Sequence, residues 1–173
     1  NGDSKDEYNA YSAPDAITVT VLDKTPDTTT LKVTQDDINY GETVNPTTSG
    51  APSDVGPVTL TYEGRDGTSY TSSPTAPMNA GKYKVKARCE NATTIFTAED
   101  DFEILAIDIS GAAVDAITGL TYTGIAHTPT PAVKMNGAPL SSTTDYTLSY
   151  SENTNAGTAT MTVTGQGNYK DTK

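Results

Sequence analysis

The sequence predicts an all-β protein that consists of two consecutive β-sandwich modules, for three reasons. Asn79-Ala80-Gly81 and Asn155-Ala156-Gly157 each precede a run in which every second residue is apolar or small. A period of two predicts a strand with one buried face, and a repeated turn-and-strand unit predicts a tandem array. No segment has the apolar periodicity of a helix over the length that a helix needs. The 173 residues are too many for one small sandwich and suit two.

The first module is predicted to span residues 16–106. Residues 1–15 are polar, and we expect them to be a flexible lead-in or the tail of a preceding unit. Glycine and proline punctuate a long loop at residues 42–57. Asp66-Gly67 is a strong turn signal, and Tyr70 is expected to begin the return strand. The expected strands are Ile17–Val21, Leu31–Val33, Ile38–Tyr40, Val58–Tyr62, Tyr83–Cys89, Ile95–Phe96 and Phe102–Ile104.

The second module is predicted to span residues 107–173, because the alternation changes register at Leu105-Ala106. No Gly/Ser-rich linker separates the modules, so we expect a stiff connection. Asn136-Gly137 predicts a hairpin turn. Few residues follow Tyr169, so the last strand is expected to be short or missing and to leave an exposed sheet edge, which can pair with another chain. The expected strands are Ile107–Ile109, Leu120–Tyr122, Val133–Met135, Tyr146–Tyr150 and Ala159–Val163.

Composition and charge exclude several classes of function. Hydrophobic residues make up 34% of the chain, below the roughly 45–50% of a globular domain, but their regular alternation argues against disorder. The net charge of −11 repels a phosphate backbone, so nucleic-acid binding is not expected, and anionic membranes are disfavoured for the same reason. No apolar run approaches the roughly 20 residues that cross a bilayer, so this segment is not expected to insert into a membrane.

No catalytic, cofactor-binding or metal-binding residues are predicted, and the chain is not expected to be an enzyme. Cys89, the single cysteine, continues an inward-facing series and is expected to be an inert buried thiol rather than a nucleophile. No Gly-x-Ser-x-Gly motif, which would provide a serine nucleophile, accompanies His127, so His127 is expected to be a surface loop histidine. The acidic pairs at Asp36-Asp37 and Glu99-Asp100-Asp101 lack the alternating pattern of a calcium loop, so solvated charge is favoured over a calcium site.

Two surface features leave a binding role open. Lys82, Lys84, Lys86 and Arg88 fall on one side of a strand. We favour a solvated face that neighbouring strand carboxylates partly neutralise, with a docking site for an acidic partner or polysaccharide as the alternative. Most tyrosines fit core or corner packing, among them Tyr62, Tyr83, Tyr146 and Tyr150. The alternative is a glycan-binding surface built from loop tyrosines such as Tyr70 or Tyr122.

Several short motifs occur in a regular order along residues 30–173. In the first module they are Ile38-Asn39-Tyr40-Gly41, Leu60-Thr61-Tyr62-Glu63-Gly64, Ser69-Tyr70-Thr71-Ser72-Ser73, Asn79-Ala80-Gly81-Lys82-Tyr83 and Asp101-Phe102-Glu103-Ile104. In the second they are Leu120-Thr121-Tyr122-Thr123-Gly124, Thr128-Pro129-Thr130, Asp145-Tyr146-Thr147-Leu148-Ser149-Tyr150, Asn153-Thr154-Asn155-Ala156-Gly157-Thr158-Ala159-Thr160 and Thr164-Gly165-Gln166-Gly167-Asn168-Tyr169. The first set resembles the MBG-type immunoglobulin-like repeat of bacterial surface proteins. The second is similar to related threonine-rich repeats of large secreted and cell-surface proteins.

This resemblance implies two consecutive immunoglobulin-like β-sandwich domains in an extracellular bacterial protein, either at the cell surface or secreted, with no catalytic residues. The basic strand Lys82–Arg88 and the incomplete last strand depart from the pattern. We therefore expect a non-enzymatic spacer or presentation scaffold, with adhesion left open. The alternatives are a carbohydrate- or protein-binding adhesin domain and an accessory module of a secreted polysaccharide enzyme. The expected partners are a glycan or a protein of a host or neighbouring cell, and neighbouring repeats of the same chain.

Overall fold

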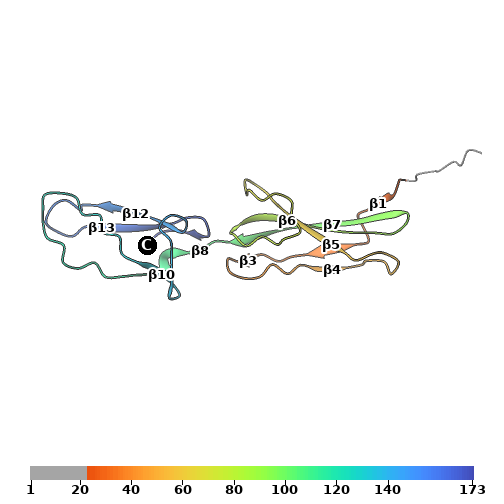
Figure 1. Ribbon diagram of the computed structural model, residues 1–173, viewed down its shortest axis with the longest axis horizontal. Coiled ribbons are helices and arrows are strands. Elements are labelled where there is room, and N and C mark those ends of the chain that lie inside the picture. Colours follow the sequence, from red (N-terminus) through yellow and green to blue (C-terminus); the bar gives the residue numbers. More distant parts are fainter. Residues whose placement is uncertain (1–22) are drawn as a thin grey trace, which may run out of the picture.

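The computed structural model describes residues 23–173, and within them the chain is all-β apart from one short 3-10 turn. The lead-in at residues 1–15 and the predicted strand at Ile17–Val21 lie outside the described residues. Two separate hydrophobic cores follow one another along an elongated molecule (Figure 1). We call residues 23–106 and 107–173, which contain these cores, the first and second modules. No helix within residues 23–173 is long and apolar enough to cross a membrane.

The first module is a sandwich-like pair of sheets. Its larger sheet has the order β1-β7-β6-β5, with β3 also paired to β7, and its smaller sheet pairs β2 with β4. The strands are β1 (Thr25–Asp27), β2 (Lys32–Thr34), β3 (Ile38–Asn39), β4 (Thr47–Ser49), β5 (Thr59–Gly64), β6 (Gly81–Glu90) and β7 (Thr94–Leu105).

The hairpin of β6 and β7 organises the first core. Every residue of β6 pairs with β7, from Gly81 opposite Ile104 to Glu90 opposite Ile95. The inward side chains of β6 alternate as the sequence predicts, and all are buried: Tyr83, Val85, Ala87 and Cys89. Phe102 stacks on Tyr83 with ring centroids 5.6 Å apart. Leu31 precedes β2 and Val33 lies within it, and both pack onto the core from the second sheet.

The second module repeats this plan with shorter strands. Its elements are β8 (Ile107–Asp108), the 3-10 turn η1 (Ile109–Gly111), β9 (Ala113–Val114), β10 (Val133–Met135), β11 (Ala138–Pro139), β12 (Tyr146–Ser151), β13 (Thr160–Gly165) and β14 (Tyr169–Lys170). β12 pairs antiparallel with β13, β9 and β11 flank β10, and β14 pairs parallel with β8. Ile109, Val133 and Val163 are the most deeply buried residues of its core.

Both predicted turn dipeptides have the expected left-handed backbone. Asn136 has φ of 49° and Gly137 has φ of 83°, and they join β10 to β11. Asp66 and Gly67 also have positive φ, at 49° and 92°. These values fit a type I′ turn, which needs residues that tolerate positive φ at both central positions.

Three expectations about local structure are wrong. Leu120–Tyr122 is not a strand, because no described segment pairs with its backbone, and alternation alone cannot supply a partner. Tyr70 does not begin a return strand; its carbonyl accepts one hydrogen bond from Gly64, and only Ser73 forms a bridge, with Tyr62. The loop at residues 42–57 contains β4, whose threonine-rich sequence gave no apolar signal.

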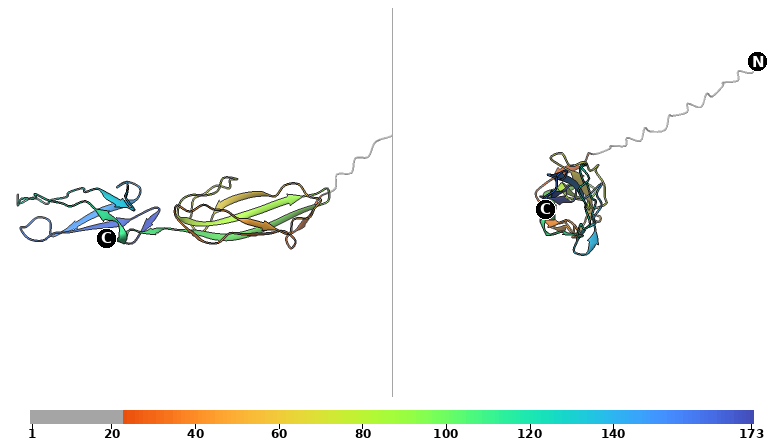
Figure 2. Two further views of the ribbon diagram at one scale, coloured as in Figure 1. Left: turned by 90° about the horizontal axis from the view of Figure 1, so that it is seen from below. Right: turned by 90° about the vertical axis from the view of Figure 1, so that its left-hand side faces the viewer.

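The two modules are joined end to end by a bonded junction. Ala106 alone separates β7 from β8. The Asn168 side chain accepts a hydrogen bond from the Ala80 backbone N–H at 2.7 Å and donates to Asn79 Oδ1 at 3.2 Å. Tyr169 packs edge-on against Tyr40 across the junction, with ring centroids 5.9 Å apart. Figure 2 shows the resulting end-to-end arrangement from two further directions.

Adjacent residues on β7 should respond differently to truncation. Ile104 is 1% exposed and Leu105 is 36% exposed. We expect Ile104→Ala to lower the free energy of unfolding of the first module by about 2–5 kcal/mol and Leu105→Ala to lower it by less than about 1 kcal/mol. Urea unfolding followed by circular dichroism measures both. Equal losses would contradict the inward and outward assignment of these two side chains.

Asp27 should contribute stability that depends on pH. Its carboxylate accepts hydrogen bonds from the backbone N–H and hydroxyl groups of Thr29 and Thr30, at 2.7–3.1 Å. The backbone bond from Thr29 is the largest of the effects that lower the Asp27 pKa from 3.8 to about 2. A carboxyl group whose pKa is lower in the folded state than in the unfolded state stabilises the folded state at pH values above its unfolded pKa. This contribution is lost as pH falls through about 2.

We therefore expect Asp27→Asn to lower the melting temperature at pH 7, and the difference from the unmodified protein to shrink as pH falls from 4 towards 2. Thermal unfolding across this pH range measures the difference. A melting-temperature difference that stays constant over the whole range would show that the Asp27 charge does not carry the effect.

Candidate functional site

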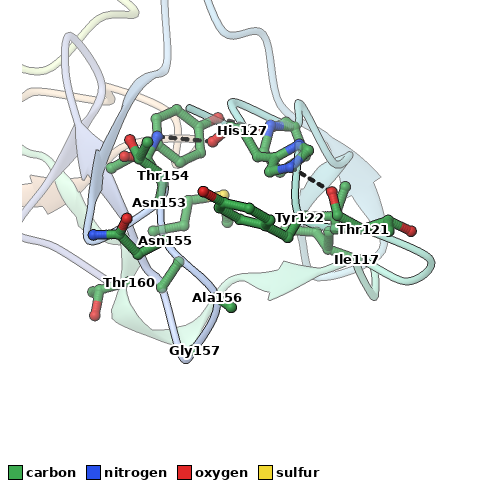
Figure 3. Close-up of a pocket in the computed structure, with 15 residues that line it drawn as sticks. Ile117, Thr121, Tyr122, His127, Asn153, Thr154, Asn155, Ala156, Gly157 and Thr160 are labelled. Atoms are coloured by element: carbon green, nitrogen blue, oxygen red, sulfur yellow. Dashed lines mark hydrogen bonds between the residues drawn. The ribbon is translucent and has the colours of Figure 1, made fainter. Parts of the chain in front are cut away.

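A groove of about 440 Å³ lies at the end of the second module away from the junction. One wall comes from the segment 117–122, and the other is the start of β13 with the Asn155-Ala156-Gly157 turn before it. Tyr150 and Met161 also line the groove. Figure 3 shows the Tyr122 side chain pointing from the first wall into the groove.

Three polar contacts hold the first wall in place without strand pairing. The His127 ring nitrogen Nε2 is 2.9 Å from the Thr121 carbonyl, so the ring donates a hydrogen bond there (Figure 3). Asn153 Nδ2 donates to the His127 carbonyl at 2.8 Å, and the Tyr150 hydroxyl donates to the Pro129 carbonyl. His127 is therefore a half-buried loop residue whose ring and backbone link two loops.

The wall presents large apolar side chains to solvent. Leu120 is 55% exposed, Tyr122 is 64% exposed and Ile117 is 38% exposed. A run of exposed apolar residues beside a concave surface is typical of an interaction site. The sequence indicated only that Leu120 and Tyr122 alternate with threonine, so the exposure of Leu120 could not be found without the structure.

The opposite wall carries an open sheet edge. β12 pairs with one edge of β13 along its whole length. On the other edge, Lys173 exchanges two backbone hydrogen bonds with Val163, Thr172 bridges Thr164, and Asp171 accepts from Gly165. No described residue pairs with this edge of β13 from Thr162 back towards Gly157. The backbone groups along that stretch are free to bond to an added strand.

The two tyrosines proposed for glycan binding have different surroundings. Tyr70 is half-buried, packs edge-on against Tyr83 with ring centroids 5.7 Å apart, and donates its hydroxyl to the Thr75 carbonyl at 2.7 Å. Tyr122 is exposed and lines the groove. Tyr122 is therefore the one of the two with a ring free to stack on a ligand.

The basic side of β6 is neutralised by carboxylates on itself and on adjacent segments. Lys84 pairs with Glu99 at 2.5 Å, and Lys86 pairs with Glu63 at 2.8 Å. Lys82 lies 3.8 Å from Asp66, and Arg88 contacts Glu90. The hydrogen bond between Lys84 and Glu99 lowers the pKa of the Glu99 carboxyl and raises the pKa of the Lys84 ammonium. This arrangement fits the neutralised sheet face favoured by the sequence.

The remaining candidate residues serve packing and backbone bonding. Cys89 is 3% exposed within the first core. Asp37 accepts a hydrogen bond from the Glu103 backbone at 2.7 Å, and Asp100 accepts one from the Gln35 backbone at 2.8 Å. These carboxylates bind the backbone of the segment around β3 and of β7. Within residues 23–173, no group of three or more His, Cys, Asp or Glu side chains could hold a metal ion.

Retention on an immobilised polyanion tests the neutralised face. We expect the protein not to be retained on heparin resin at low ionic strength, because the β6 cations are paired and the net charge is −11. The matched variant Glu63→Gln/Glu99→Gln removes both carboxylate partners of Lys86 and the nearer partner of Lys84, and it should be retained more strongly. Strong retention of the unmodified protein would instead indicate a cationic docking site.

Comparison of the chain with models of known protein families, with curated proteins and with solved structures gave no match. The resemblance to bacterial immunoglobulin-like repeats therefore rests on the sequence motifs and stays a prediction. The all-β, sandwich-like architecture rests on the strand pairing itself.

Proposed function

We propose that this protein is a non-enzymatic, extracellular pair of immunoglobulin-like modules from a bacterial surface or secreted protein. Its role would be that of a spacer that holds a neighbouring functional unit at a distance. The junction between the modules is the observation that carries this proposal. A spacer must resist bending, and one intervening residue with side-chain bonds on both sides leaves little freedom for the two units to move.

The junction bonds use groups that would otherwise be left without partners. The Ala80 N–H lies in the turn before β6, outside the sheet ladder, and Asn168 supplies its acceptor. The backbone carbonyl of Asn168 also accepts a hydrogen bond from the Ile107 backbone N–H at 3.0 Å, which fixes the first residue of β8. A single residue, through its side chain and its backbone, thus contacts the first module, the linker and the second module. This geometry transmits force along the long axis rather than through a flexible hinge.

A second candidate function, a carbohydrate- or protein-binding adhesin domain, is favoured by the groove of the second module. The groove combines an exposed aromatic ring, Tyr122, with amide side chains at Asn153 and Asn155. Aromatic rings beside amides suit sugar recognition, whereas an open strand edge suits a peptide. A glycan array and a pull-down with host-cell proteins would separate these ligands, and negative results in both would favour the spacer.

Asn168→Ala should loosen the junction while leaving both modules folded. The variant loses the side-chain bonds to Asn79 and Ala80, each worth about 0.5–1.5 kcal/mol. Spin labels at the exposed positions Ser49 and Thr147 would report the distance distribution between modules. We expect a narrow distribution in the unmodified protein and a broader one in the variant.

Asn153→Ala is the matched control, because it removes one amide side-chain bond in the groove wall, away from the junction. It should leave the distance distribution narrow. A distribution that is already broad in the unmodified protein would rule out a stiff spacer.

A further inference from the structure

The turn between β10 and β11 carries a chemically reactive dipeptide. Asn136-Gly137 is the only Asn-Gly pair within residues 23–173, and both residues are exposed. The side chain of asparagine is an amide, and the backbone nitrogen of the next residue can attack it. Glycine hinders this attack least, because it has no Cβ atom and its backbone adopts many conformations. The pair can therefore react with itself wherever the fold leaves both groups accessible.

The fold leaves the backbone of Gly137 accessible. A Cβ atom placed on Gly137 would meet no other atom within 4 Å. Among the described residues, no backbone carbonyl accepts a hydrogen bond from the Gly137 N–H. The nitrogen therefore faces open space, and no backbone bond holds its proton.

The turn can also open at low cost. Asn136 and Gly137 have φ of 49° and 83°, and closing a ring between the Gly137 nitrogen and the Asn136 side chain requires this tight turn to relax. The hairpin that resists relaxation has only two residue pairs, and both residues of β11 are exposed. Short, exposed ladders are among the first parts of a fold to open.

The first module has a turn with similar backbone angles that is much less reactive. Asp66 also has φ of 49°, and Gly67 has φ of 92°. The side chain of Asp66 is a carboxylate, which is a poor target for a nucleophile and has no ammonia to lose. The turn is also anchored, because Thr68 donates to the Arg65 carbonyl at 2.8 Å and Arg65 donates to the Lys82 carbonyl at 2.9 Å. Asp66-Gly67 is therefore an internal reference for the second module.

We propose that Asn136-Gly137 is a site of spontaneous deamidation, which converts this turn to isoaspartate as the protein ages. The Gly137 nitrogen attacks the side-chain carbon Cγ of Asn136. A bond from this nitrogen to Cγ forms, and the bond from Cγ to Nδ2 breaks. Nδ2 leaves as ammonia, together with the proton that Gly137 gives up, and the product is a five-membered succinimide ring.

Water then opens the succinimide ring at one of its two carbonyls. Attack at Cγ breaks the new bond to the Gly137 nitrogen and leaves an ordinary aspartate. Attack at the backbone carbonyl of residue 136 breaks the original peptide bond and leaves isoaspartate, in which the main chain runs through the former side chain. Either product differs from asparagine by the gain of one water and the loss of one ammonia, so no oxidant or reductant is needed.

Isoaspartate cannot keep the turn. It adds one atom to the main chain of a two-residue connection, whose geometry depends on left-handed backbone at both central positions. The register of β11 against β10 is then lost, and β10 carries Val133 and Met135, which are 1% and 8% exposed in the second core. Ordinary aspartate keeps the length of the main chain and has the same φ at Asp66.

We therefore expect the loss of stability to come from isoaspartate and not from the new charge. This inference goes beyond the spacer function and does not depend on it. It gives the second module a limited lifetime that is set by its own sequence.

Peptide mapping of the full 173-residue chain after incubation at neutral and at mildly alkaline pH tests the site. Trypsin releases residues 135–170 as one peptide. We expect this peptide to gain about 1 Da, and to gain it faster at the higher pH, because the Gly137 nitrogen must lose its proton. Electron-transfer fragmentation should place isoaspartate at position 136. The same peptide contains the exposed pair Asn155-Ala156, which should keep its amide over the same period.

Asn136→Gly is the matched variant, because glycine tolerates the turn and has no side-chain amide to attack. Thermal unfolding followed by circular dichroism should give a lower melting temperature for aged than for fresh unmodified protein, and no such loss for Asn136→Gly. Fresh Asn136→Asp has the new charge without the extra atom in the main chain. It should melt close to the fresh unmodified protein.

Three results would each overturn the proposal. The first is an Asn136 amide that stays intact through the incubation. The second is an equal loss of melting temperature in the aged unmodified protein and in the aged Asn136→Gly variant. The third is a fresh Asn136→Asp variant that melts as low as the aged protein, since charge alone would then account for the loss.

Discussion

The pairing of β6 with β7 is the interaction on which the first module and its junction depend. Because the two strands pair without a break from Gly81 to Glu90, their inward side chains form the core and their outward side chains meet as ion pairs. The same pairing carries the chain to Leu105, from which β8 follows after one residue. Strand register therefore sets core packing, surface charge and the direction of the next module together.

The second module shows what happens when this pairing is only partly made. β12 and β13 form a complete pair, and Val163 is as deeply buried as residues of the first core. Beyond Val163, however, the outer edge of β13 has no partner among residues 23–173. The facing segment that includes Leu120 forms no strand.

Charge has a structural use in this acidic protein. The cations of β6 are matched by carboxylates such as Glu99 and Glu63, which lie on the neighbouring strands at distances of 2.5 and 2.8 Å. Other carboxylates bind backbone N–H groups, as Asp27 does in the turn after β1. Exposed ion pairs add little stability individually. Their arrangement removes a free positive surface and leaves the excess negative charge to keep the protein soluble.

The sequence by itself determined the all-β class, the strand at Tyr83–Cys89 and the Asn136-Gly137 turn, because alternation and turn chemistry are local properties. It could not decide that Leu120–Tyr122 would stay unpaired, since a strand exists only where a partner's backbone is in reach. Nor could it bring Asn168 to Ala80, a contact between residues far apart in the chain. The tertiary structure decided both, because hydrogen-bond partners across a fold are chosen by the positions of whole sheets and not by neighbouring residues.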